Sequence, residues 1–419
     1  MGCGVTVFHY GYFVICQNGR LAPAGDDWRA TPNSYKCGDH LGPKNGVKAT
    51  VIDVVTGQEA ALNNIDVMIL LEEQPAKTIP PLEWVKHVAT RMANARPRRL
   101  TSWPQIQGNF HGQKFRAVRN KIYPRPQDET FQDFQINHLL WFLGEEWFNA
   151  EMAKPLEQRH IVLRWRHERN EQLRKHDSRV GDKSVPLKGP MTGGAKALQV
   201  LADDVYQLAQ SLDAPSGIAQ RLGDMHEFQG VRYEILVASL FARCGFQIGF
   251  IDDTAKRNPE FIASKGTERI AVEAKSRHRA GVLHERGEFT EDAPAKVKEL
   301  YESALGQNPG GMPFVVFIDV NLPLSPQVTI HEKDWVKEAM QAFDYRRQEG
   351  RVDSDTALIL TNFGWYFTRD PQLPPGEHII ARDEKPQHGI AEETWTLLGR
   401  ALAEYGLLID EEQYADRAK

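Results

Sequence analysis

Two charged side chains in the second half of the chain, Glu273 and Lys275, stand in a segment that is otherwise typical of a buried strand. The segment 268–275 reads ERIAVEAK, and the period of two places Glu273 and Lys275 on the same face of the strand. A carboxylate beside an amine can hold a cation and stabilise negative charge on a phosphate oxygen. These residue types and this spacing therefore point to chemistry on a phosphate group.

A second carboxylate, Glu260, is predicted to lie beside this pair. The expected strand 258–264 precedes the loop Lys-Gly-Thr at Gly266, and a short glycine-containing loop suits a hairpin. Glu260 then lies at about the distance from the turn that brings it next to Glu273. Asp252 or Asp253 is the alternative source of this acid.

A third carboxylate, Glu234, lies in the helix that we expect over 225–244. At about 100° per residue, Glu234 falls among the apolar positions of this helix. The opposite, polar arc consists of Gln229, Arg232, Ser239 and Arg243. A buried carboxylate is costly unless a cation or hydrogen bonds compensate it, so Glu234 either belongs to a site or pairs with a buried arginine.

Three carboxylates and one lysine form a donor set with a specific use. Hard oxygen ligands bind Mg²⁺ or Mn²⁺, and the expected metal ligands are Glu234, Glu260 and Glu273. A bound metal ion lowers the pKa of a water molecule, and Lys275 can orient that water or stabilise the developing charge. The set predicts phosphodiester hydrolysis that requires no nucleotide cofactor and no covalent nucleophile.

The order of these elements resembles the PD-(D/E)xK nuclease superfamily, which has the restriction-endonuclease-like fold, over about residues 225–325. The resemblance implies that Glu234 is the helix acid, that Pro259-Glu260 is the hairpin element and that Glu273-Ala274-Lys275 is the acid-x-lysine motif. Glu260 stands where the family usually has Asp. The resemblance implies a nuclease acting in restriction, phage defence or repair; the alternative is an inactive nucleic-acid-binding module of the same fold.

The charge distribution points to a polyanionic partner. Residues 86–125 contain ten Lys and Arg and no Asp or Glu, and aromatic residues lie between them, although the chain as a whole has a formal net charge of -5. We expect this stretch to bind nucleic acid, DNA rather than RNA. The predicted contacts are Arg96, Arg98, Arg99, Lys114, Arg116, Arg119 and Lys121. The alternatives are pairing with the acidic region 331–419 and a structural subunit that holds a protein partner.

The hydrophobic pattern predicts an α/β (α+β) fold in several parts. A β-rich domain, 1–129, precedes a helical segment, 130–176, with an apolar stripe that includes Trp141, and a linker, 177–195. The nuclease domain, 196–419, alternates helices and strands, which is typical of a mixed sheet flanked by helices. The expected helices are 196–212, 225–244, 292–305, 332–348 and 392–405. The expected strands are 246–251, 258–264, 268–275, 313–320, 356–362 and 377–382.

Composition excludes several classes of protein. Hydrophobic residues make up 41% and charged residues 26%, so the chain is not wholly disordered. No apolar run reaches the roughly 18 residues of a membrane span. Four scattered cysteines favour the reducing cytoplasm over a disulfide scaffold. An oligomer or a partner protein is compatible with this sequence.

Overall fold

The computed structural model describes seven strands before residue 126 and most of the chain from there to residue 407. The early strands are β1 (Gly4–His9), β2 (Val14–Cys16), β3 (Lys48–Asp53), β4 (Glu59–Ala61), β5 (Gln107–Phe110), β6 (Gln113–Val118) and β7 (Lys121–Arg125). The later described ranges are 126, 128–176, 191–211, 216–251, 258–284, 287–290, 295–348, 356–368, 373–382 and 389–407. The sequence also predicts a strand at 64–71 and a short helix at 80–95, and both lie outside the described residues.

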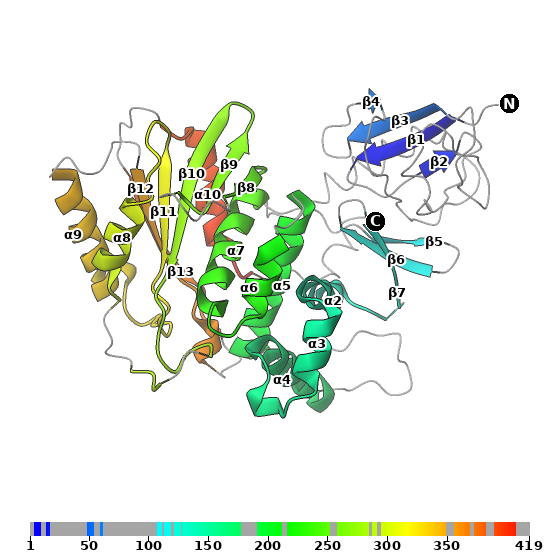
Figure 1. The fold of residues 1–419 in the computed structure, drawn as a ribbon, viewed down its shortest axis with the longest axis horizontal. Coiled ribbons are helices and arrows are strands. Elements are labelled where there is room, and N and C mark those ends of the chain that lie inside the picture. Colours follow the sequence, from blue (N-terminus) through cyan, green and yellow to red (C-terminus); the bar gives the residue numbers. More distant parts are fainter. Residues whose placement is uncertain are drawn as a thin grey trace.

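A mixed six-stranded sheet forms the centre of the C-terminal half (Figure 1). Its strands are β8 (Gln247–Phe250), β9 (Phe261–Lys265), β10 (Glu268–Ser276), β11 (Phe314–Asp319), β12 (Thr356–Asn362) and β13 (Glu377–Ala381). The order is β13-β12-β11-β10-β9-β8, with β10, β11 and β12 parallel and antiparallel pairing elsewhere. The predicted mixed sheet and its six predicted strands are confirmed.

Helices cover both faces of this sheet. On one face α8 (Val297–Leu305) and α9 (Asp334–Gln348) pack in the cluster of Ala271, and on the other α7 (Phe228–Arg243) and α10 (Glu392–Ala403) pack in the cluster of Ile270. All residues of β11 and β12 are buried, as their nearly continuous apolar sequences require in parallel strands covered on two sides.

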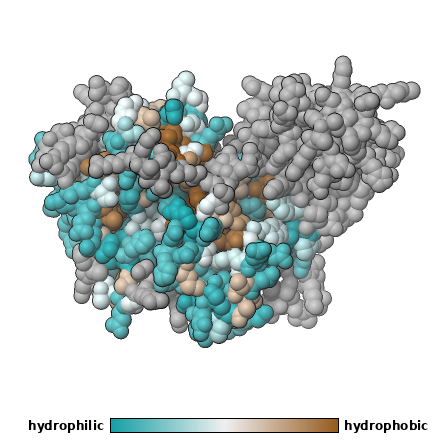
Figure 2. Space-filling model, in the orientation of Figure 1, coloured by the Kyte–Doolittle hydropathy of each residue, from teal (hydrophilic) through white to brown (hydrophobic). Residues whose placement is uncertain are grey.

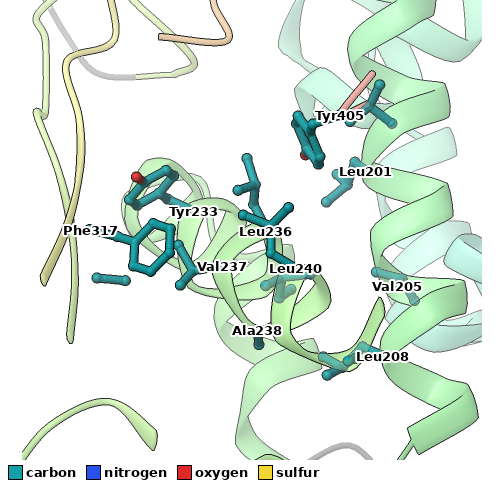
Figure 3. Packing of buried hydrophobic residues seen from close by; sticks show 14 of the residues in the cluster. Leu201, Val205, Leu208, Tyr233, Leu236, Val237, Ala238, Leu240, Phe317 and Tyr405 are labelled. Atoms are coloured by element: carbon teal, nitrogen blue, oxygen red, sulfur yellow. The ribbon is translucent and has the colours of Figure 1, made fainter. Parts of the chain in front are cut away.

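The helix α7 is enclosed on every side by other elements. Figure 3 shows Tyr233 and Val237 directed toward Phe317 of the sheet, and Leu236 and Leu240 directed toward the neighbouring helix. That neighbour is α5 (Gly193–Ser211), whose first residues were expected in the linker.

The expectation that α7 is amphipathic was wrong, because its polar arc is buried as well. Each polar side chain has an internal partner instead of water: Ser239 donates to Asp204 at 2.7 Å, Arg243 pairs with Asp204 at 2.9 Å, and Arg232 pairs with Asp319 at 2.7 Å.

The predicted helical segment is confirmed and belongs to the same core. It consists of α2 (Phe131–Leu143), α3 (Glu145–Met152), a short 3₁₀ turn (Leu156–Gln158) and α4 (Ile161–Lys175). Thr130 caps α2, because its hydroxyl accepts from the Asp133 N–H at 3.0 Å. Trp141, expected in the core, is 44% exposed; it stacks on Tyr123 with 5.1 Å between ring centroids.

On the face of the molecule in Figure 2, the described surface is mostly hydrophilic, with small apolar areas between the polar ones. Within the described ranges, no helix combines the length and the hydrophobicity that crossing a bilayer requires.

Candidate active site

The β9–β10 hairpin brings two of the predicted site residues together. Antiparallel pairing runs from Lys265 opposite Glu268 to Phe261 opposite Val272, so that Glu260 comes opposite Glu273 in the next pair. The Glu260 backbone N–H donates to Oε2 of Glu273 at 3.1 Å. The predicted hairpin, and the proximity of these two acids within it, are confirmed.

Glu273 is almost fully buried and is neutralised by its neighbour along the strand. Its side chain is 2% exposed, and its Oε1 forms an ion pair with the ammonium group of Lys275. Burial raises the pKa of Glu273, an effect that the charge of Lys275 opposes. Lys275 itself is 24% exposed, so its ammonium group can reach a ligand from solvent.

Glu234 is held by an arginine that the sequence analysis did not single out. The Arg221 Nη1 and Nη2 atoms donate to the two carboxylate oxygens of Glu234 at 2.9 and 2.8 Å, and Arg221 also pairs with Glu227 at 2.8 Å. Arg221 lies on α6 (Ser216–Gly223), a helix that was not expected. Pairing with an arginine was the alternative for Glu234, although Arg221 is 41% exposed rather than buried.

The pKa of Glu260 depends on the charges of the other residues of the candidate site. The pKa of Glu260 is raised to about 8: burial is the largest cause, the negative charges of Glu234 and Glu273 add to the rise, and the positive charges of Lys275 and Arg221 oppose it. In the part of the chain that the structure describes, no donor bonds the carboxylate of Glu260. Glu234, Glu260 and Glu273 share two cations, and one of these, Arg221, also pairs with Glu227, so the acids are in excess. Protonation of Glu260 reduces that excess near neutral pH.

The donor set fits a divalent cation at two of the three acids. Across the described ranges, no group of three or more His, Cys, Asp and Glu side chains is arranged to hold a metal ion. Arg221 engages both oxygens of Glu234, so this carboxylate is occupied while the pair is formed, and its role as a metal ligand stays a prediction. Glu260 and Glu273 remain, and one or two carboxylates with water and phosphate are the usual ligands of Mg²⁺ in proteins.

Asp319 and Asn321, near the end of β11, have structural partners. Asp319 pairs with Arg232 at 2.7 Å and accepts the Asn321 N–H at 3.2 Å. The Asn321 side chain donates to the Arg277 carbonyl at 2.9 Å. These bonds fix the end of the strand. Asp252 and Asp253 lie outside the described residues.

One of the predicted nucleic-acid contacts is corrected. Arg116 on β6 is fully buried, donates to the Glu129 carbonyl at 2.7 Å and lies 5.2 Å from the centre of the Phe131 ring. It therefore anchors β6 to α2 and offers no charge to a phosphate. The side chains of Arg96, Arg98, Arg99, Lys114, Arg119 and Lys121 lie outside the described residues.

Comparison of the chain with protein-family models, with curated proteins and with solved structures finds no match in any of the three. The resemblance to the PD-(D/E)xK superfamily therefore depends on the order of the acids and the lysine in the sequence. The mixed sheet and the acidic hairpin are compatible with it, and membership of that family stays a prediction.

Proposed function

We propose that the chain is a metal-dependent nuclease that hydrolyses phosphodiester bonds, with DNA as the favoured substrate. One observation carries the proposal: Glu260 and Glu273 meet in a hairpin with Lys275 beside them, and when both acids are ionised their negative charge exceeds the charge of Lys275. A structural ion-pair network would be expected to match these charges. An acidic site that receives a divalent cation keeps negative charge that no side chain neutralises, because the cation supplies the neutralising charge.

The roles of the residues follow from their surroundings. Glu260 and Glu273 would hold Mg²⁺ or Mn²⁺. When bound, such a cation activates water and offsets charge on the phosphate oxygens. Lys275, partly exposed beside Glu273, would orient the attacking water or stabilise the charge that develops on the phosphate. Arg221 holds the carboxylate of Glu234 in place next to these residues.

This activity would serve restriction, phage defence or repair of DNA in the cytoplasm. The basic stretch 86–125 would hold the polynucleotide while the hairpin carries out the chemistry. The part of this stretch that the structure describes, β6 packed on α2, supports a physical connection between the two regions.

The decisive experiment compares the wild type with Lys275→Ala on plasmid, linear and single-stranded DNA and on RNA, with Mg²⁺, Mn²⁺ or EDTA. We expect cleavage by the wild type with the metal ions only, and a rate lowered by about 100-fold or more in the variant. Lys337→Ala, which removes a lysine exposed on α9, is the matched control and should cleave normally. Equal cleavage by wild type and Lys275→Ala would show that the proposed site does not carry out the reaction.

A second candidate is an inactive nuclease-fold module that only binds nucleic acid. Two observations favour it: Glu260 replaces the usual Asp, and Arg221 occupies both oxygens of Glu234. A titration with Mg²⁺ separates the two functions, because an inactive module binds DNA without cutting it at any concentration of the metal ion.

A further inference from the structure

An arginine extends the row of charged side chains on β10. The Arg277 backbone N–H donates to the Asp319 carbonyl at 2.9 Å, so the chain keeps pairing with β11 beyond the last residue of the strand. The period of two then places Arg277 on the same face as Glu273 and Lys275. The row consists of an acid, an amine and a guanidinium group at alternate residues.

This guanidinium group has no carboxylate partner among the described residues. Its Nη1 donates to the carbonyl of His278 at 2.8 Å, and its Nε is buried without an acceptor. The Nε atoms of Arg232 and Arg243 also lack an acceptor, but each of those arginines is neutralised by an aspartate. A partly buried cation without a counter-ion is costly unless a ligand supplies one.

A second arginine next to Arg277 makes the surroundings more positive. Arg279 is buried and donates to the Val320 carbonyl at 3.0 Å. Burial lowers the pKa of Arg279, and the charge of Arg277 lowers it further. The nearby acid, Asp319, is engaged by Arg232. Two adjacent guanidinium groups beside an engaged carboxylate form an environment that suits an anion.

We propose that Arg277 is a binding site for a backbone phosphate of the nucleic acid, adjacent to the phosphodiester on which Glu260, Glu273 and Lys275 would act. This inference rests on the proposed function, which it deepens by assigning a second phosphate contact to the chain. The planar guanidinium group donates to two phosphate oxygens at once, and a polynucleotide presents phosphates on both sides of the bond that is cut.

The test measures binding without cleavage. The affinity of the full chain for a fluorescently labelled DNA duplex is measured by anisotropy in EDTA over a range of KCl concentrations. We expect Arg277→Gln to weaken binding about tenfold and to reduce the slope of log affinity against log salt by about one. Arg277→Lys should keep most of that slope. Arg174→Gln, at an exposed position on α4, is the matched control and should change neither quantity.

Equal affinity and equal slope for wild type and Arg277→Gln would overturn the inference. Thermal unfolding checks that Arg277→Gln is folded, and Arg277→Met, which also removes the charge, provides the same test if the glutamine variant is not folded. Failure of the inference and failure of the proposed function give different results. If cleavage depends on Lys275 and Arg277→Gln binds DNA as the wild type does, only the phosphate site at Arg277 is disproved. If binding depends on Arg277 but no DNA is cleaved, only the proposed nuclease activity is disproved.

Discussion

Glu260 is the residue with the most unusual electrostatics in the candidate site. Its pKa of about 8 arises from burial and from two neighbouring carboxylates. A carboxyl group that holds its proton near neutral pH has to release it before a cation can bind. We therefore expect metal binding to release a proton, and metal affinity to rise with pH up to about 8.

The raised pKa also predicts how stability depends on pH in EDTA. The pKa of Glu260 is higher in the folded protein than the ordinary value of 4.5, so its contribution to stability is present below that value and is lost as the pH rises to about 8. Glu260→Gln imitates the protonated group. We expect the variant to exceed the wild type in free energy of unfolding by at least about 1 kcal/mol at high pH and to match it at low pH. Urea unfolding at both pH values tests this, and parallel curves for the two proteins would contradict it.

Arg221 occupies both carboxylate oxygens of Glu234 and would therefore compete with a metal ion for this side chain. Arg221→Gln leaves Glu234 without its cation, so we expect the affinity for Mn²⁺ to rise about tenfold, since a third carboxylate becomes accessible to the ion. Calorimetric titration measures this affinity. The double variant Arg221→Gln/Glu234→Gln is the control and should return to the affinity of the wild type. An unchanged affinity in the single variant would show that Glu234 faces away from the bound ion.

At the scale of elements, the β9–β10 hairpin positions the site. Its turn requires Gly266, whose φ of +59° lies in the left-handed region. We expect Gly266→Val to lower the free energy of unfolding by about 1–2 kcal/mol and to reduce cleavage, because Glu260 shifts relative to Glu273. Gly399→Ala, in α10 with open space around it, is the control and should not destabilise the protein. Urea unfolding of both variants measures these free energies. An equal loss of stability in the two variants would show that the effect does not come from the turn.

The sequence predicts elements well where the chain is apolar and less well where side chains pair over long distances. Strand β12 was predicted residue for residue, because seven consecutive residues of strand character are followed by Phe-Gly. The short helix α6 was missed, since eight residues give little periodicity. The partners of Arg221 and of Arg116 were missed for a different reason. The two residues of an ion pair between elements have no fixed separation in the sequence, so no sequence pattern predicts the pair.

At the scale of the whole molecule, the helical segment and the sheet domain share one core, and a smaller cluster joins β6 to α2 and α5. Phe134 of α2 is fully buried with Val118 of β6 and Tyr206 of α5. We expect Phe134→Ala to lower the free energy of unfolding by about 3–5 kcal/mol, as measured by circular dichroism in urea. Met340→Ala, at a site on α9 that is 40% exposed, should cost little. Similar midpoints for wild type and Phe134→Ala would indicate that β6, α2 and α5 are not held together by this cluster.

The enclosure of α7 has a consequence for variation. Other elements contact this helix on all sides, so a larger or differently charged side chain cannot project into solvent and would have to fit inside the protein. In a library of random substitutions, α7 should therefore tolerate the fewest replacements, whereas α9, which leaves Met340 and Tyr345 exposed, should tolerate many. Natural drift in this protein would then accumulate in the outer layer and spare the central helix.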